Sequence, residues 1–305
     1  MLKSKPPKLF LLEAQPSYQA PPTSSEDHWD LVIQPKAHLF DLNLKEVWKY
    51  RDLLLLFVKR DFVAQYKQTI LGPLWHFIQP IFTTLMFLVV FGKIASIPTD
   101  GVPPLLFYMS GITIWNYFSS CLSSTSNTFL ANAGIFGKVY FPRLVIPLST
   151  VISNLVKFGI QFLLLMGAFV FFAIKGTPVH LTISFLMIPI LVLMMAAMGL
   201  GLGIIISSLT TKYRDLNILI GFAVQLLMYA TPVAYPLSFI KDNKYASWIE
   251  WNPLTPIVEA FRYALFQQGS FSAGSLLYST AFIVIVLFIG LLTFSKVERT
   301  FMDTV

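Results

Sequence analysis

The chain of 305 residues is poor in charge and in cysteine. Charged residues make up 12% of it, about half of the roughly 25% that soluble domains carry, and the mean hydropathy is +0.68. Of 22 Lys+Arg and 15 Asp+Glu, only 15 residues fall between Pro73 and Ser295. The single cysteine, Cys121, excludes an intrachain disulfide. This scarcity excludes a soluble globular enzyme, a disordered chain and a nucleic-acid-binding domain, although a net charge of +7 would otherwise suggest nucleic acid.

The sequence also lacks the motifs of an enzyme. Its four histidines are scattered, with no spacing that would hold a metal ion. The best match to a phosphate-binding loop is Gly137-Lys138, but Val139 stands where Ser or Thr is needed. Gly199-Leu-Gly201-Leu-Gly203 lies in an apolar run, where small residues favour close helix packing rather than dinucleotide binding. We therefore predict no catalytic residue, no metal and no cofactor in this chain.

Long apolar runs are what the sequence does contain. Six of them are long enough for a hydrocarbon core of about 30 Å at about 1.5 Å per helical residue. They cover about residues 72–92, 105–127, 144–174, 181–209, 216–235 and 276–294. The pattern predicts an all-α polytopic membrane protein with six transmembrane helices, in contact with membrane lipids.

The segments outside these runs differ in character. Residues 1–42 hold six prolines and predict a proline-rich cytoplasmic tail without a regular helix. Residues 43–71 predict a cationic amphipathic helix that lies in the membrane interface and leads into the 72–305 transmembrane domain. Residues 236–274 are apolar but carry six charges, so we expect short re-entrant helices that dip partway into the membrane before the last span.

The cations give the orientation. With the N-terminus inside, 16 Lys and Arg residues fall on the cytoplasmic side and 5 on the outer side, as the positive-inside rule requires. Six spans then place both termini in the cytoplasm.

Few polar groups within the spans are candidates for function. Lys157 is the ionisable residue well inside a span; it either lines a substrate path or extends its ammonium toward the cytoplasmic interface. Aromatic side chains could form a path for a polymer, or could be interfacial belts and ordinary packing. These aromatic candidates are Trp75, Tyr108, Trp115, Tyr117, Tyr229 and Tyr235. Because the spans lack acidic residues for ion coupling, active transport would need energy from a partner.

Several motifs, in order, resemble those of the membrane domain of type-2 ABC exporters, and in particular the permeases for O-antigen polysaccharides and teichoic acids. The similarity runs from about Asn43 to the C-terminus. The motifs are Tyr50-Arg51-Asp52-Leu53-Leu54, Lys59-Arg60-Asp61-Phe62, Tyr66-Lys67-Gln68-Thr69-Ile70-Leu71-Gly72-Pro73-Leu74-Trp75, Lys138-Val139-Tyr140-Phe141-Pro142-Arg143, Tyr213-Arg214-Asp215-Leu216, Thr231-Pro232-Val233 and Asn252-Pro253-Leu254.

The resemblance implies a homodimer in the bacterial cytoplasmic (inner) membrane, with two separate ABC subunits that bind ATP and Mg. It implies a pore at the dimer interface and a coupling helix, docked on the ATPase, that carries Lys138, Tyr140, Phe141 and Arg143. Arg60 and Asp61 on the preceding amphipathic helix would flank it. The short helices near Asn252, Pro253, Glu259 and Arg262 would form an outer gate.

Three functions fit the sequence. The first is the permease half of an ATP-driven exporter of a lipid-linked polysaccharide. The second is an exporter of a small amphiphile such as a drug or lipid. The third is a membrane scaffold that transports nothing. A wide aromatic path would favour the first, and a narrow apolar interface would favour the second.

Overall fold

The structure is a computed structural model that describes residues 44–304, apart from residues 68, 137, 140, 178–181, 214 and 241–245. The predicted tail, residues 1–42, lies outside the described residues, and so does Tyr140 of the predicted coupling segment. The described residues belong to one compact unit, residues 38–305.

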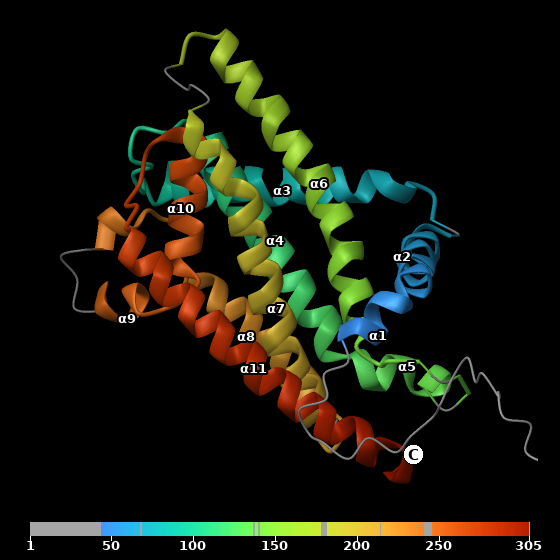
Figure 1. The fold of residues 1–305 in the computed structure, drawn as a ribbon. Helices are drawn as coiled ribbons and strands as arrows, with labels where there is room; N and C mark the ends of the chain where they lie inside the picture. Colours follow the sequence, from blue (N-terminus) through green and yellow to red (C-terminus); the bar gives the residue numbers. More distant parts are fainter. Residues whose placement is uncertain are drawn as a thin grey trace, which may run out of the picture. The chain divides into compact units, whose positions relative to one another are not determined.

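Every regular element in the described ranges is a helix (Figure 1). The helices are α1 (Leu44–Lys49), α2 (Arg51–Tyr66), α3 (Trp75–Phe87), α4 (Pro104–Ser126), α5 (Thr128–Phe136), α6 (Val145–Ile174), α7 (Ile188–Thr210), α8 (Leu216–Tyr229), α9 (Ala246–Glu250), α10 (Thr255–Phe266) and α11 (Ala273–Thr304). A π-helical stretch, Leu88–Ile94, continues α3, and short 3₁₀ helices occur at Gly72–Leu74, Ile183–Met187 and Leu237–Ile240. The predicted all-α fold is confirmed.

Each predicted span contains a helix, but the helices differ in their suitability for crossing a membrane. Among the described residues, four helical segments are long and apolar enough to cross it: Trp75–Ile94, Val145–Ile174, Ile183–Thr210 and Ala273–Glu298. Helix α8 is apolar but shorter. Helix α4 has 23 residues, most of them buried, and its second half is rich in serine and threonine. The polytopic fold is therefore clear, and the count of six crossings stays a prediction.

The predicted interface helix of residues 43–71 is divided in the structure. Helix α1 ends at Lys49, Tyr50 adopts a turn conformation with φ −92° and ψ 21°, and α2 begins at Arg51. On α2, Phe57 is buried against the protein, whereas Leu55 and Leu56 are exposed. These exposed apolar side chains leave a surface that a membrane interface could cover.

Helices α4, α7 and α11 are joined by close backbone approach (Figure 1). A Cβ added at Gly203 would lie 2.5 Å from the Cβ of Thr125 on α4, and one added at Gly199 would lie 2.8 Å from the Cβ of Cys121. On the other side of α7, a Cβ on Gly290 of α11 would lie 2.9 Å from the Gly201 carbonyl oxygen. The glycines of α7 therefore allow helix packing, as the sequence predicted.

A second cluster of buried side chains, here called the connector cluster, lies where α5 meets α2, α6, α7 and α11. Its members are Phe57, Phe129, Phe136, Phe141, Val145, Ile146, Ile204 and Phe294. The rings of Phe129 and Phe294 stack with centroids 4.8 Å apart, which joins α5 to α11. This cluster attaches the α5 region to three long helices at once.

Candidate functional site

Helix α10 carries the two charged residues of the predicted outer gate. Pro256 stands in its first turn, where the missing N–H is not needed. Gln267 ends the helix in a left-handed conformation with φ 57°. Glu259 and Arg262 lie three residues apart and so share one face of the helix. Their exposed fractions are 1% and 2%.

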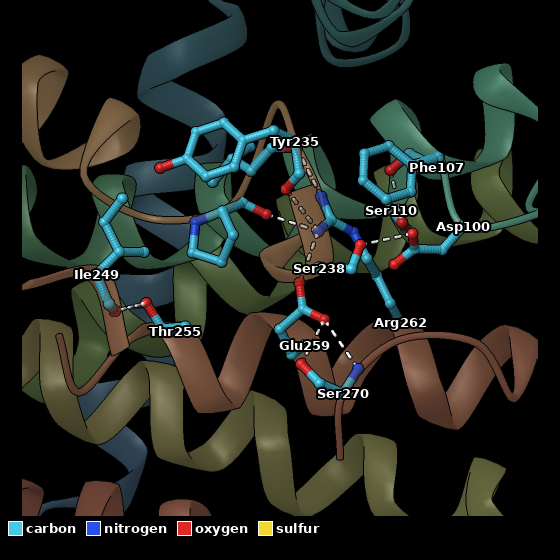
Figure 2. A network of polar contacts seen from close by, with 12 residues as sticks. Asp100, Phe107, Ser110, Tyr235, Ser238, Ile249, Thr255, Glu259, Arg262 and Ser270 are labelled. Atoms are coloured by element: carbon cyan, nitrogen blue, oxygen red, sulfur yellow. Dashed lines mark hydrogen bonds and ion pairs between the residues drawn. The ribbon is translucent and has the colours of Figure 1, made fainter. Parts of the chain in front are cut away.

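Arg262 is held from several directions. Its Nη1 lies 3.2 Å from Glu259 Oε1 and donates to the Pro232 carbonyl oxygen at 2.6 Å. Its Nη2 donates to the Val233 carbonyl oxygen at 2.6 Å, and its Cζ lies 3.8 Å from the centroid of the Phe107 ring on α4. Figure 2 shows the guanidinium between α10 and the segment that ends at Tyr235. We call these contacts the Arg262 network.

The Glu259 carboxylate is also paired at its second oxygen. Oε2 accepts hydrogen bonds from the Ser270 backbone N–H at 3.2 Å and from the Ser270 hydroxyl at 3.4 Å. A buried charge is stable only when it is paired and hydrogen-bonded. The Arg262 network meets this requirement at Nη1 and Nη2, while the buried Nε has no hydrogen-bond partner in the described residues. The network fixes α10 against α4 and the segment after α8.

Asn252 and Pro253 add contacts in the same region. The Asn252 Nδ2 donates to the Ala230 carbonyl oxygen and to the Thr231 hydroxyl, each at 2.9 Å. The Pro253 carbonyl oxygen accepts a hydrogen bond from the Ser279 hydroxyl of α11 at 2.7 Å. The structure therefore brings all four predicted gate residues into one region, which fixes the end of α8. Their role as a gate stays a prediction.

The predicted coupling segment extends from α5 into the loop before α6. Lys138 and Val139 are exposed, Val139 by 57%, whereas Phe141 is buried in the connector cluster. The Phe141 ring lies 5.7 Å from the Phe57 ring of α2, so the loop and α2 are attached to each other. An exposed tip on a fixed base suits docking by a partner.

Arg143 lies at the base of this loop, where its side chain contacts other helices, rather than at the exposed tip. Its Nη1 donates to the backbone carbonyl oxygen of Glu298 on α11, and its Cζ lies 5.4 Å from the centroid of the Phe136 ring. Burial lowers the pKa of the Arg143 guanidinium, and the Glu298 carboxylate opposes this shift. Arg143 therefore links α5 to the end of α11.

Arg60 and Asp61 lie on α2 beside the connector cluster. Arg60 Nη2 donates to Asp61 Oδ1 at 2.7 Å, and the guanidinium carbon lies 4.7 Å from the centroid of the Phe57 ring. Arg60 and Asp61 are thus paired with each other. Arg60 contacts the Phe57 ring, which in turn contacts the Phe141 ring, so the pair lies near Phe141.

The aromatic candidates for a substrate path divide into two groups. Tyr108, Trp115 and Tyr117 are buried in the core of the chain, so they contribute almost nothing to its surface in this conformation. Trp75 and Tyr229 are exposed by 51% and 48%. Tyr235 donates its hydroxyl to the Tyr229 carbonyl oxygen at 2.7 Å. Of these aromatic candidates, Trp75 and Tyr229 are therefore the ones placed to contact a molecule outside the chain without a rearrangement.

Lys157 lies in a polar pocket between α2, α3, α4 and α6 and is partly exposed there. Within the described ranges, no three His, Cys, Asp or Glu side chains are grouped so as to hold a metal ion.

Sequence reasoning missed the partners of these residues. Ser270, Ser279, Thr231 and the Glu298 carbonyl oxygen all form hydrogen bonds that define the two regions. Each bond joins residues that are distant along the chain, so no local pattern of residue types could have identified them.

These features define the class of the protein: it is a multi-pass α-helical membrane protein. The profile of the ABC-2 type transporter family matches residues 52–266. The chain belongs to the ABC-2 type transporter family.

Similar proteins agree with this assignment. The chain is 30% identical over 256 residues to the O-antigen export system permease protein RfbA of Klebsiella pneumoniae, covering 83% of this chain and 94% of that protein. It is 26% identical over 266 residues to the RfbA permease of Myxococcus xanthus, covering 86% of this chain and 98% of that protein. It is 26% identical over 251 residues to the polysialic acid transport protein KpsM of Escherichia coli, covering 80% and 93%.

Proposed function

We propose that this chain is the permease half of an ATP-driven exporter that moves a lipid-linked polysaccharide, of O-antigen or teichoic-acid type, across the bacterial inner membrane. The observation that carries the proposal is the similarity to two kinds of polysaccharide permease over nearly their whole lengths. Both termini would lie in the cytoplasm, as the distribution of cations indicates.

The energy would come from two separate ABC subunits that bind ATP and Mg. The exposed tip at Lys138 and Val139 supports this, because it offers a docking point on the side that the cations assign to the cytoplasm. The connector cluster would pass a displacement of this tip to α2, α7 and α11.

A second copy of the chain would complete the pore. Helices α3 and α8 support this, since both expose large apolar side chains along much of their length, including Phe82 and Met86 on α3 and Ile218 and Phe222 on α8. Paired faces of this kind would enclose a path that includes Trp75 and Tyr229.

The test is reconstitution of the full chain with its ABC subunit in liposomes. We expect ATP hydrolysis to rise when the lipid-linked polysaccharide is added, and a deletion strain to lose surface polysaccharide and accumulate the polymer inside. Unchanged surface polysaccharide together with stimulation by small amphiphiles alone would contradict the proposal. Failure to bind or stimulate any ABC subunit would instead indicate a scaffold.

A further inference from the structure

The polar pocket around Lys157 has a volume of about 240 Å³ and lies between α2, α3, α4 and α6. Its lining includes amide side chains from all four helices and the ammonium group of Lys157, but no carboxylate. The amides are those of Gln65, Gln79, Asn116, Asn154 and Gln161. We call it the amide pocket.

The amide pocket lies where the predicted interface helix meets two segments that could cross a membrane. These segments are Trp75–Ile94, which is α3 with its π-helical continuation, and helix α6. Lys157 comes twelve residues after Val145, the first residue of α6, which at about 1.5 Å per residue is about 18 Å along the helix. Polar groups within a membrane-crossing helix are costly unless they have partners, and an ionisable group there indicates function.

Some of these polar groups have partners within the protein and others have none. Asn116 Nδ2 donates to Gln161 Oε1 at 3.2 Å. In the described part of the chain, the Lys157 ammonium and the side-chain amides of Gln65 and Gln79 form no hydrogen bond or ion pair. Asp61 attracts Lys157 electrostatically but is bound by Arg60 and does not line the pocket. The site is therefore rich in unused donors and carries a positive charge.

We propose that the amide pocket binds the phosphate group of an anionic lipid. The Lys157 ammonium would pair with the phosphate, and the Gln65 and Gln79 amides would donate to its oxygens. A neutral sugar would leave the ammonium charge uncompensated, so a phosphate fits better than a segment of polysaccharide.

Access and size both fit a lipid head group. Gln65 of α2 and Gln79 of α3 are exposed, so the pocket opens at the surface between the predicted interface helix and the first span. Acyl or prenyl tails could remain in the bilayer while the head group enters. The volume of about 240 Å³ is many times the roughly 10–15 Å³ that a cavity needs to hold one water molecule, so a phosphate or a diphosphate can enter.

The phosphate could come from two lipids. One is the diphosphate of the lipid that carries the polysaccharide, and this possibility rests on the proposed function. The other is a membrane phospholipid, which requires no polysaccharide substrate.

The test measures lipid binding to the purified full chain by native mass spectrometry. Two matched pairs of probes separate the head group from the tail: geranylgeranyl diphosphate against geranylgeraniol, and phosphatidylglycerol against diacylglycerol. The variants are Lys157→Gln and Lys157→Arg. Lys175→Gln is the matched control, because Lys175 follows the other end of α6 and lies over the Phe171 ring.

We expect Lys157→Gln to weaken binding of a phosphate-bearing lipid by about tenfold or more, while Lys157→Arg and Lys175→Gln bind as the wild type does. Preference for geranylgeranyl diphosphate would identify the carrier lipid, and preference for phosphatidylglycerol would identify a membrane phospholipid. Equal binding by the wild type and Lys157→Gln, or equally tight binding of the alcohols, would overturn the proposal. Because the assay uses neither ATP nor export, its outcome is separate from that of the proposed function.

Discussion

The Arg262 network yields a quantitative prediction about stability. Substituting Arg262→Met keeps much of the side-chain volume but removes the charge. Glu259 is then a buried carboxylate without a counter-ion, which typically costs about 3–5 kcal/mol. The Pro232 and Val233 carbonyl oxygens also lose their donors, at about 1–3 kcal/mol each if they stay buried. These terms overlap, so we expect an unfolding free energy lower by about 3–5 kcal/mol.

The double variant Arg262→Met, Glu259→Gln tests the cause of this loss. The glutamine is neutral and can still accept the hydrogen bond from the Ser270 N–H. The double variant should therefore be more stable than Arg262→Met alone, with a coupling energy of about 1–3 kcal/mol. The assay is reversible unfolding of the full chain in mixed micelles of SDS and a mild detergent. Lys175→Met serves as the surface control. A loss below about 1 kcal/mol in the single variant, or fully additive effects of the two substitutions, would refute the reasoning.

Three further predictions concern other parts of the fold. Gly203→Leu should abolish folding, measured by size-exclusion of a fluorescent fusion, because a Cβ there meets Thr125 at 2.5 Å; Gly167→Leu on α6, with open space around it, should behave as the wild type. Arg143→Glu should reduce substrate-stimulated ATP hydrolysis while the protein still inserts, since it breaks the link to α11; normal coupling in a well-expressed variant would contradict this role. Lys138→Glu should leave the melting temperature unchanged but weaken binding of the ABC subunit in pull-down assays, and unaltered binding would show that the partner docks elsewhere.

The sequence predicted the helical fold well, because the number of residues in an apolar run sets the length of the helix that the run forms. It could not predict the break at Tyr50, since the residues on both sides favour helix; in the structure, Tyr50 packs against the connector cluster. It predicted α8 to extend to residue 235, but the helix ends at Tyr229. The reason is Pro232, which has no N–H to continue the helix and disfavours helical geometry at Thr231. The carbonyl oxygens of Pro232 and Val233 then accept hydrogen bonds from Arg262.

For the candidate residues too, the sequence predicts what depends on neighbouring residues, but not what depends on contacts between residues distant along the chain. Glu259 and Arg262 stand out in an apolar sequence, and their spacing of three already predicts a shared face. Tyr108 and Trp115 could not be separated from Trp75 by sequence, because burial of an aromatic residue depends on which helices surround it. The motif singled out Arg143 as a coupling residue, which stays a prediction, and its bond to a carbonyl oxygen on α11 could be found only from the tertiary structure.

The glycine contacts on both sides of α7 limit how this protein can move. Helix α7 cannot slide along α4 or α11, because any shift would drive side chains into backbone atoms that now lie against glycine. Close-packed elements of this kind move as rigid bodies rather than deform. We therefore expect α4, α7 and α11 to move together as a rigid three-helix unit. Any opening of the protein must come from rotation of this unit as a whole or from movement of the less tightly held helices α3 and α8. Labels for distance measurements should accordingly be placed in pairs between the three-helix unit and α3 or α8, where a change in separation is expected. Pairs of labels within the three-helix unit serve as the reference, because their separation should not change.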